Sequence, residues 1–219
     1  MKNVSYDIFK PVDSVIIMAA GPSISSNFDG IRRFQAENPD HVVLACNYDF
    51  PIDAEYTVFI DNGRYRRFID SIRSPNIIIA PYFGPWLKKK HFTADRTFYK
   101  LKWNADVQPY DVSGILVNKD GSTGHKLGNC GMTCLYLAHM FRPTKVLVAG
   151  LDGPQPDNKT VKHFNNITRT WTKKDIDRVD PKKKYLRKLV KFLRARGAET
   201  YTFSNCPFWE QQSIARIWE

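Results

Sequence analysis

The feature that most constrains the fold is an unbroken apolar run, Val15 to Ala20, that ends in Gly21, Pro22 and Ser23. A run without polar alternation predicts a strand buried on both faces, and the Gly-Pro pair predicts a sharp turn directly after it. Gly21 lets a ligand approach the backbone, and the Ser23 hydroxyl suits a helix start or an anion. The segment therefore predicts either a strand that leads into a binding site or a tight corner without a ligand.

Strands and helices alternate along the rest of the chain. The predicted strands are 41–46, 56–60, 76–80, 145–149 and 199–203, and the predicted helices are 28–38, 64–72, 132–141 and 181–196. This alternation is typical of a parallel sheet with right-handed crossovers. We therefore expect an α/β, Rossmann-like three-layer fold with a mostly parallel central sheet and a small lid or insertion.

Small polar residues lie at the ends of these elements. Asn47, Asn62 and Asp152 each follow a predicted strand, and Asn129 and Gly131 precede a predicted helix whose first amides suit an anionic group. Each also has an ordinary use, because Asn and Asp commonly form turns and helix caps. Ligands of open α/β sheets bind beyond the carboxyl ends of the strands. We therefore expect one cleft to be surrounded by Ser23, Asn47, Asn62, Gly131 and Asp152.

The chain is expected to fold as one core with two additions. The core comprises residues 1–80 and 127–219. Residues 81–126 lose periodicity and are rich in lysines and aromatic residues, which predicts an insertion or lid. Such a composition suits a nucleic-acid or sugar surface as well as a solvated insertion. Within the core, the polar segment 154–180 predicts a mobile cover loop over the ligand edge.

Two residues are candidates for a general base. His163 lies in the cover loop, and imidazole titrates near neutrality, although a loop histidine is often simply exposed to solvent. Asp152 offers a carboxylate that can take a proton or hold a sugar hydroxyl. The same loop carries Arg169, Lys173 and Lys174, which are candidates for contacts with a phosphate or with the acceptor.

The charge favours negatively charged partners. The chain of 219 residues has a formal net charge of +11, which suits nucleotides, nucleic acid, acidic glycans or an anionic membrane surface. The four cysteines, Cys46, Cys130, Cys134 and Cys206, form no CxxC pair, so we expect reduced thiols and no metal site. No stretch has the length and apolar character of a signal core or a membrane span, which predicts a cytoplasmic protein without a transmembrane segment.

Five short motifs, in this order, carry a resemblance to known enzymes. They are A-G-P-S at 20–23, C-N-Y-D-F at 46–50, V-F-I-D-N at 58–62, a Gly-rich turn into a helix at 128–137 and V-A-G-L-D at 148–152. The chain resembles the bacterial lipooligosaccharide sialyltransferases over most of residues 14–206, except 81–126. It is also similar to the 6-hydroxymethylpterin diphosphokinase-like family, which shares the nucleotide-binding core.

The resemblance implies a nucleotide site. In the sialyltransferases, the Gly-Pro-Ser turn and the asparagines at the next strand ends hold a cytidine monophosphate donor. The same role falls here to Gly21, Pro22, Ser23, Asn47 and Asn62, with Asn129 and Gly131 at the start of the following helix.

Two departures from the family pattern lie near the expected site. The family's Ser-Gly pair corresponds to Cys130-Gly131, so the serine hydroxyl is missing. The family's histidine base is replaced by Val179-Asp180-Pro181. Either His163 or Asp152 takes the role of the base, or the reaction differs.

These features favour an enzyme, a metal-independent glycosyltransferase that uses a CMP- or UDP-sugar. The acceptor is a hydroxyl on a glycan or on a hydroxymethylated DNA base, the second being a DNA-modification reaction. One alternative is a magnesium-dependent diphosphotransferase of the pterin kinase type that would use Asp61, Asp152 and Asp157. The other is a nucleic-acid-binding module without catalysis, which would use the basic face of the helix 181–196.

Overall fold

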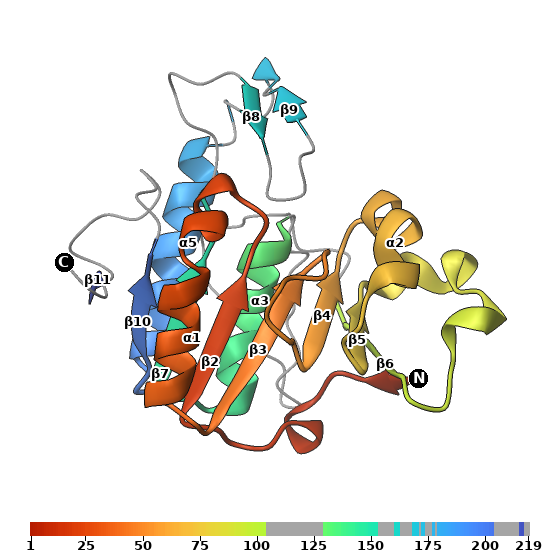
Figure 1. Cartoon of the computed structure of the whole chain (residues 1–219), viewed down its shortest axis with the longest axis horizontal. Helices are drawn as coiled ribbons and strands as arrows, with labels where there is room; N and C mark the ends of the chain where they lie inside the picture. The colour runs from red at the N-terminus through yellow and green to blue at the C-terminus, as the bar shows by residue number, and fades with distance from the viewer. Residues whose placement is uncertain are drawn as a thin grey trace.

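A computed structural model describes residues 1–103, 129–152, 160–162, 168–170, 172–173, 177, 179–203 and 215–216. Within these residues, nine strands form one sheet in which every neighbouring pair is parallel, in the order β1-β6-β5-β4-β3-β2-β7-β10-β11 (Figure 1). The strands are β1 (Lys2–Asn3), β2 (Ser14–Met18), β3 (His41–Cys46), β4 (Tyr56–Phe59), β5 (Asn76–Ile79), β6 (Thr97–Lys100), β7 (Lys145–Ala149), β10 (Glu199–Thr202) and β11 (Ala215–Arg216). The expected α/β fold with a parallel central sheet is confirmed.

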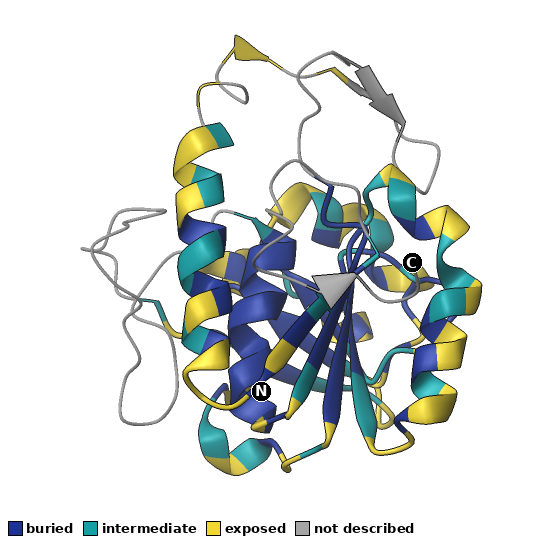
Figure 2. Cartoon of the chain, turned by 90° about the vertical axis from the view of Figure 1, so that its left-hand side faces the viewer, coloured by how far each residue is buried: buried dark blue, intermediate teal, exposed yellow. Residues whose placement is uncertain are grey.

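Helices cover both faces of this sheet, as the unbroken apolar strands require (Figures 1 and 2). The longer helices are α1 (Phe28–Glu37), α2 (Asn62–Phe68), α3 (Cys130–Ala138) and α5 (Val179–Arg194). Ile16 and Met18 of β2 belong to the same hydrophobic cluster as the inner face of α1. Val15 and Ile17 point to the opposite face and join the cluster that contains α3 and α5. Alternate residues of β2 thus fill two separate core layers.

The strand order places a reversal at the centre of the sheet. From β2 the chain continues through β3, β4, β5 and β6 toward one edge. It then returns to β7, which pairs with β2 on the side opposite to β3, and continues to β10. In open α/β sheets, the carboxyl ends of two strands that flank such a reversal form the usual ligand site. The topology therefore predicts a ligand site at the residues that follow β2 and β7.

Part of the predicted insertion belongs to the core. Thr97–Lys100 forms β6, which pairs with β5 on one side and with β1 on the other. The assignment of all of 81–126 to an insertion or lid is therefore wrong for residues 97–100. The lysines and aromatic residues around this strand interrupt the apolar pattern from which a strand is predicted. The segment before β6 forms two short 3₁₀ helices, Pro81–Trp86 and Lys89–His91, and residues 104–126 lie outside the described part.

The predicted cover loop contains regular structure in its described residues. Strands β8 (Thr160–Lys162) and β9 (Thr168–Thr170) pair as an antiparallel hairpin, and α5 begins at Val179. Figure 1 shows the hairpin beyond the carboxyl ends of the central strands. None of the described helices has the length and apolar character needed to cross a bilayer.

Candidate functional site

The corner after β2 is bonded directly to the loop after β7. The ladder between the two strands continues as Ala19 N donates to Ala149 O at 2.8 Å, and Gly21 N donates to Gly150 O at 2.8 Å. Gly150 has φ +71°, in the left-handed region that favours glycine. A Cβ at Gly21 would lie 2.4 Å from Gly150 O, so only glycine fits this approach. The glycine corner therefore keeps the two strand ends in contact at the reversal of the sheet.

Asp152 fixes the Gly-Pro-Ser turn. Its Oδ2 accepts a hydrogen bond from Ser23 N at 2.7 Å, and its Oδ1 accepts one from Ser23 Oγ at 2.5 Å. The Asp152 residue is only 5% exposed. Asn27 Nδ2 donates to Ser23 O at 2.6 Å and holds the other side of the turn. The structure thus joins two of the residues that the sequence suggested, although they are 129 positions apart.

This geometry suits Asp152 to a positioning role. Both of its carboxylate oxygens already accept hydrogen bonds from Ser23, and the group is buried. A general base needs an oxygen within reach of the acceptor's hydroxyl proton. The structure shows the contacts of Asp152 with Ser23, and the assignment of Asp152 as a base stays a prediction.

Asn47 directly follows β3 and has a left-handed backbone conformation. Its φ is +64°, a left-handed conformation that Asn adopts more readily than most residues. Its amide nitrogen still donates to Val58 O at 3.0 Å, which extends the pairing of β3 with β4. Its Oδ1 atom is buried and has no hydrogen-bond partner among the described residues. Because an unpaired buried acceptor is unfavourable, this oxygen suits a donor group supplied by a ligand.

The first turn of α3 lies against the ends of β4 and β7. Asn129 caps the helix, since its Oδ1 accepts from Met132 N at 3.2 Å. A Cβ at Gly131 would lie 2.5 Å from Leu151 Cδ1, which places this turn beside the residue before Asp152. On the other side, Cys130 Sγ donates to Val58 O at 3.0 Å. The amino end of α3, where the helix dipole favours an anion, therefore lies at the same edge as Asp152.

Other predicted site residues are less closely joined to this group. Asn62 is the first residue of α2 and is exposed, and no described contact links it to Asn47 or Asp152. Asp61 instead caps α2 by accepting from Arg64 N at 2.9 Å.

The basic residues of the predicted cover loop are only partly described. Arg169 lies in β9 opposite Val161, and Lys173 is exposed. His163 and Lys174 lie outside the described residues, so their predicted roles are untested.

His91 is a buried structural residue. Its Nδ1 lies 2.7 Å from the Tyr65 hydroxyl and 3.3 Å from the Lys88 amide nitrogen. Both groups can donate to Nδ1, so the neutral ring with its proton on Nε2 fits this environment. Among the described residues, Asp70 is the acid that pairs with the ring, and its Oδ1 lies 3.8 Å from His91 Nε2. The contacts of His91 therefore serve the packing of the segment 81–92 against α2.

Stability is expected to fall in mildly acidic solution because of His91. Burial lowers the pKa of His91, Asp70 opposes this shift, and Lys90, Lys88 and Arg96 add to it. As the pH falls below about 6.5, the unfolded chain binds a proton at His91 before the folded chain does, so the free energy of unfolding decreases. Urea unfolding between about pH 7.5 and pH 5.5 should show a smaller decrease in His91→Gln than in the wild type. Equal decreases in both proteins would contradict this account.

The side chains of three cysteines come together in the core next to the candidate site. Cys46 ends β3, while Cys130 and Cys134 lie one turn apart on α3, and their sulfur atoms all lie within 4.8 Å of one another. Burial raises the pKa of the Cys130 and Cys134 thiols well above the usual value. Sequence analysis missed this cluster. The four-residue spacing of Cys130 and Cys134 predicts a shared helix face, but nothing local indicates that Cys46 joins them.

Comparison with known proteins adds no assignment. No model of a known protein family matches the chain, and no curated protein matches it at a significant level.

Proposed function

We propose that this protein is a glycosyltransferase that takes a sugar from a CMP- or UDP-sugar without using a metal ion. The observation that carries the proposal is the corner at the reversal of the sheet, where Asp152 holds Ser23 and the Gly21 backbone contacts Gly150. Such a corner supports phosphate or ribose binding because it lies at the carboxyl ends of the two strands that flank the reversal, where open α/β sheets bind their ligands. The acceptor is a hydroxyl on a glycan or on a hydroxymethylated DNA base.

The residues around the corner suit different parts of a nucleotide sugar. The Ser23 hydroxyl donates to Asp152 and can still accept a hydrogen bond from a ribose hydroxyl. The amino end of α3, with Asn129 and Gly131, suits the phosphate. The unpaired Oδ1 of Asn47 suits a hydroxyl or amino donor on the ribose or base. Asn62 is exposed at the start of α2. It would contact the nucleotide only if α2 moved toward the corner or if the ligand reached as far as α2.

The proposed reaction is a substitution at the anomeric carbon of the sugar. The acceptor oxygen forms a bond to that carbon while the bond from the carbon to the nucleotide phosphate oxygen breaks. The acceptor hydroxyl gives its proton to His163, and the nucleotide leaves as an anion. Arg169, Lys173 and Lys174 offset the charge that develops on the leaving phosphate.

The basic face of α5 favours a polyanionic acceptor. The helix buries Tyr185, Leu186, Leu189, Val190 and Leu193. Its exposed or half-exposed side chains include Lys184, Lys188, Lys191 and Arg194. The same face supports the second candidate function, a nucleic-acid-binding module without catalysis, because clustered cations bind phosphates irrespective of sequence.

The carboxylates provide less support for a magnesium-dependent diphosphotransferase. Among the described residues, the only group of three potential metal ligands is the cysteine cluster. Asp61 caps α2 and Asp152 holds Ser23, so each already has a structural task. Asp157 lies outside the described residues.

A thermal-shift screen of nucleotides and nucleotide sugars, with and without magnesium, tests the proposal. A cytidine or uridine compound at about 100 times its Kd should stabilise the fold by about 2.7 kcal/mol. For a chain of this size that corresponds to roughly 5–10 °C in Tm. The shift should require no metal. It should be smaller in Ser23→Ala and unchanged in the control Ser71→Ala, whose exposed hydroxyl donates only to Phe68 O.

Two outcomes would contradict the transferase. Stabilisation that appears only with magnesium would favour the diphosphotransferase. Stabilisation by polyanions, with no effect of any free nucleotide, would favour the nucleic-acid-binding module.

A further inference from the structure

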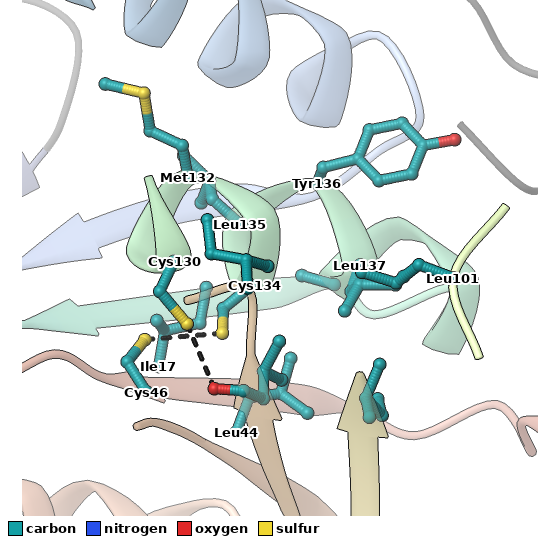
Figure 3. Close-up of a cluster of buried hydrophobic side chains, with 14 of the residues drawn as sticks. Ile17, Leu44, Cys46, Leu101, Cys130, Met132, Cys134, Leu135, Tyr136 and Leu137 are labelled. Atoms are coloured by element: carbon teal, nitrogen blue, oxygen red, sulfur yellow. Dashed lines mark hydrogen bonds between the residues drawn. The ribbon is translucent and has the colours of Figure 1, made fainter. Parts of the chain in front are cut away.

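We propose that Cys46, Cys130 and Cys134 form a binding site for one soft cation of the Cu(I) class. The site goes beyond the proposed transferase function and does not depend on it. The three side chains come from β3 and α3 and converge on one point inside the core (Figure 3). Cys46, Cys130 and Cys134 are only 2%, 8% and 0% exposed, respectively.

The sulfur spacing fits coordination of one cation. A metal–sulfur bond is about 2.3 Å long, so three sulfurs around a cation in one plane lie on the order of 4 Å apart. Cys46 Sγ and Cys134 Sγ are 3.3 Å apart, and none of the three sulfurs is more than 4.8 Å from another. The 3.3 Å separation is shorter than this spacing, so a bound cation would move the sulfurs of Cys46 and Cys134 slightly apart. Small side-chain rotations would bring the three sulfurs into a trigonal arrangement.

The ligand set favours a soft cation with three ligands. Thiolates select Cu(I) or Zn(II), whereas structural zinc sites almost always have four ligands. No fourth Cys, His, Asp or Glu joins this group among the described residues. The Met132 thioether, although it lies on the same helix, points away from the three thiols in Figure 3. Three sulfurs in an apolar environment therefore fit Cu(I) better than Zn(II).

The start of α3 offsets part of the negative charge that the bound thiolates carry. Cys130 is the first residue of α3, and the dipole of that helix favours negative charge at its amino end. Binding of Cu(I) would break three S–H bonds, form three Cu–S bonds and release three protons to solvent. No electron is transferred, so copper must arrive as Cu(I). The hydrogen bond from Cys130 Sγ to Val58 O is lost in the same step.

Copper binding would constrain the residues next to the proposed nucleotide site. Asn47 follows Cys46 and Gly131 follows Cys130, so two of the three ligands are bonded to predicted nucleotide contacts. A cation held by both elements would fix the end of β3 against the first turn of α3. Occupancy of the cysteine cluster is therefore expected to raise the Tm of the whole domain.

The test is a competition titration of the full chain. Reduced protein under anaerobic conditions is mixed with Cu(I) held by the chelator bicinchoninate, and copper bound per chain is measured by mass spectrometry after gel filtration. The wild type should retain about one copper per chain, because a buried thiolate set competes well for Cu(I). Cys46→Ser and Cys134→Ser should each lose at least roughly tenfold in affinity, as each removes a direct ligand.

Two matched variants serve as controls. Met132→Leu removes a sulfur that points away from the cluster, and Cys206→Ser removes the remaining thiol of the chain. Both should keep the copper. Loss of copper in either, or equal retention in Cys46→Ser and the wild type, would overturn the three-cysteine site. Preferential retention of Zn(II) in a parallel titration would overturn the assignment to Cu(I).

A measurement on the wild type tests the proposal even if the cysteine variants fail to fold. X-ray absorption at the copper edge of the copper-bound wild type should show three sulfur neighbours. A spectrum dominated by nitrogen or oxygen neighbours, or a wild type that retains no copper, would refute the proposal.

Discussion

Replacing Gly150 with alanine is expected to lower the free energy of unfolding by about 2–5 kcal/mol, from left-handed backbone strain and overpacking. Gly150 has φ +71°, and an added Cβ would lie 2.0 Å from Ala19 O and 3.0 Å from Ile24 Cβ. The backbone has little freedom to relieve this overlap, because Gly21 N donates to Gly150 O. The substitution therefore acts on the contact between β2 and β7 at the candidate site.

Substitutions of two other glycines separate the two causes of the lost stability, which are backbone strain and overpacking. Gly197 has φ +85° with no atom within 4 Å of an added Cβ, so Gly197→Ala should cost only the backbone strain of about 1–2 kcal/mol. Gly84 has neither a positive φ nor a neighbour within 4 Å, so Gly84→Ala should change stability by less than about 1 kcal/mol. Urea unfolding measures all three. Equal losses in Gly150→Ala and Gly197→Ala would show that the approach to Ala19 is not tight.

Replacing Asp152 with alanine is expected to lower nucleotide affinity at least roughly tenfold and to destabilise the fold by about 2–4 kcal/mol. The variant leaves Ser23 N and Ser23 Oγ without the carboxylate oxygens that now accept from them at 2.7 and 2.5 Å. The Gly-Pro-Ser turn then loses its link to the strand end at β7. Calorimetric titration with the nucleotide found in the thermal screen, together with urea unfolding, measures both effects.

Asp61→Ala is the matched control for Asp152. Asp61 also follows a central strand, but its Oδ1 only caps α2 through Arg64 N. Loss of such a cap costs about 1 kcal/mol, and nucleotide affinity should stay within about threefold of wild type. If Asp61→Ala weakens nucleotide binding as much as Asp152→Ala does, the site lies nearer to β4 than to the reversal between β2 and β7.

The core of the fold could be predicted because its strands are buried on both faces. The run 145–149 predicts a strand with the bounds that β7 has, and the apolar run that starts at Val15 overlaps β2 closely. The edge strands β1 and β11, and β6 next to the edge, have no comparable pattern. Lys2–Asn3 is exposed, and Thr97–Lys100 lies among lysines and aromatic residues. Such strands form because a neighbouring strand edge is available, which a local pattern does not encode.

The candidate site could be predicted only in part, for a similar reason. The polar residues at strand ends are visible in the sequence, and parallel topology predicts that they share one edge. That Ser23 bonds to Asp152 depends on β7 pairing with β2, and no local signal specifies this neighbour. The cysteine cluster has the same origin, since Cys46 reaches Cys134 only through packing of α3 on β3.

Strand β2 gains its two neighbours at very different times during synthesis. Pairing with β3 can occur early, whereas pairing with β7 must await the residues up to Ala149. Until then Ser14–Met18, which is buried in the finished sheet, has one open hydrogen-bonding edge that can pair with another chain. Contacts between such distant segments slow folding relative to local ones. The nascent protein is therefore expected to be most prone to aggregation just before β7 emerges, and a chaperone that shields β2 would improve its yield.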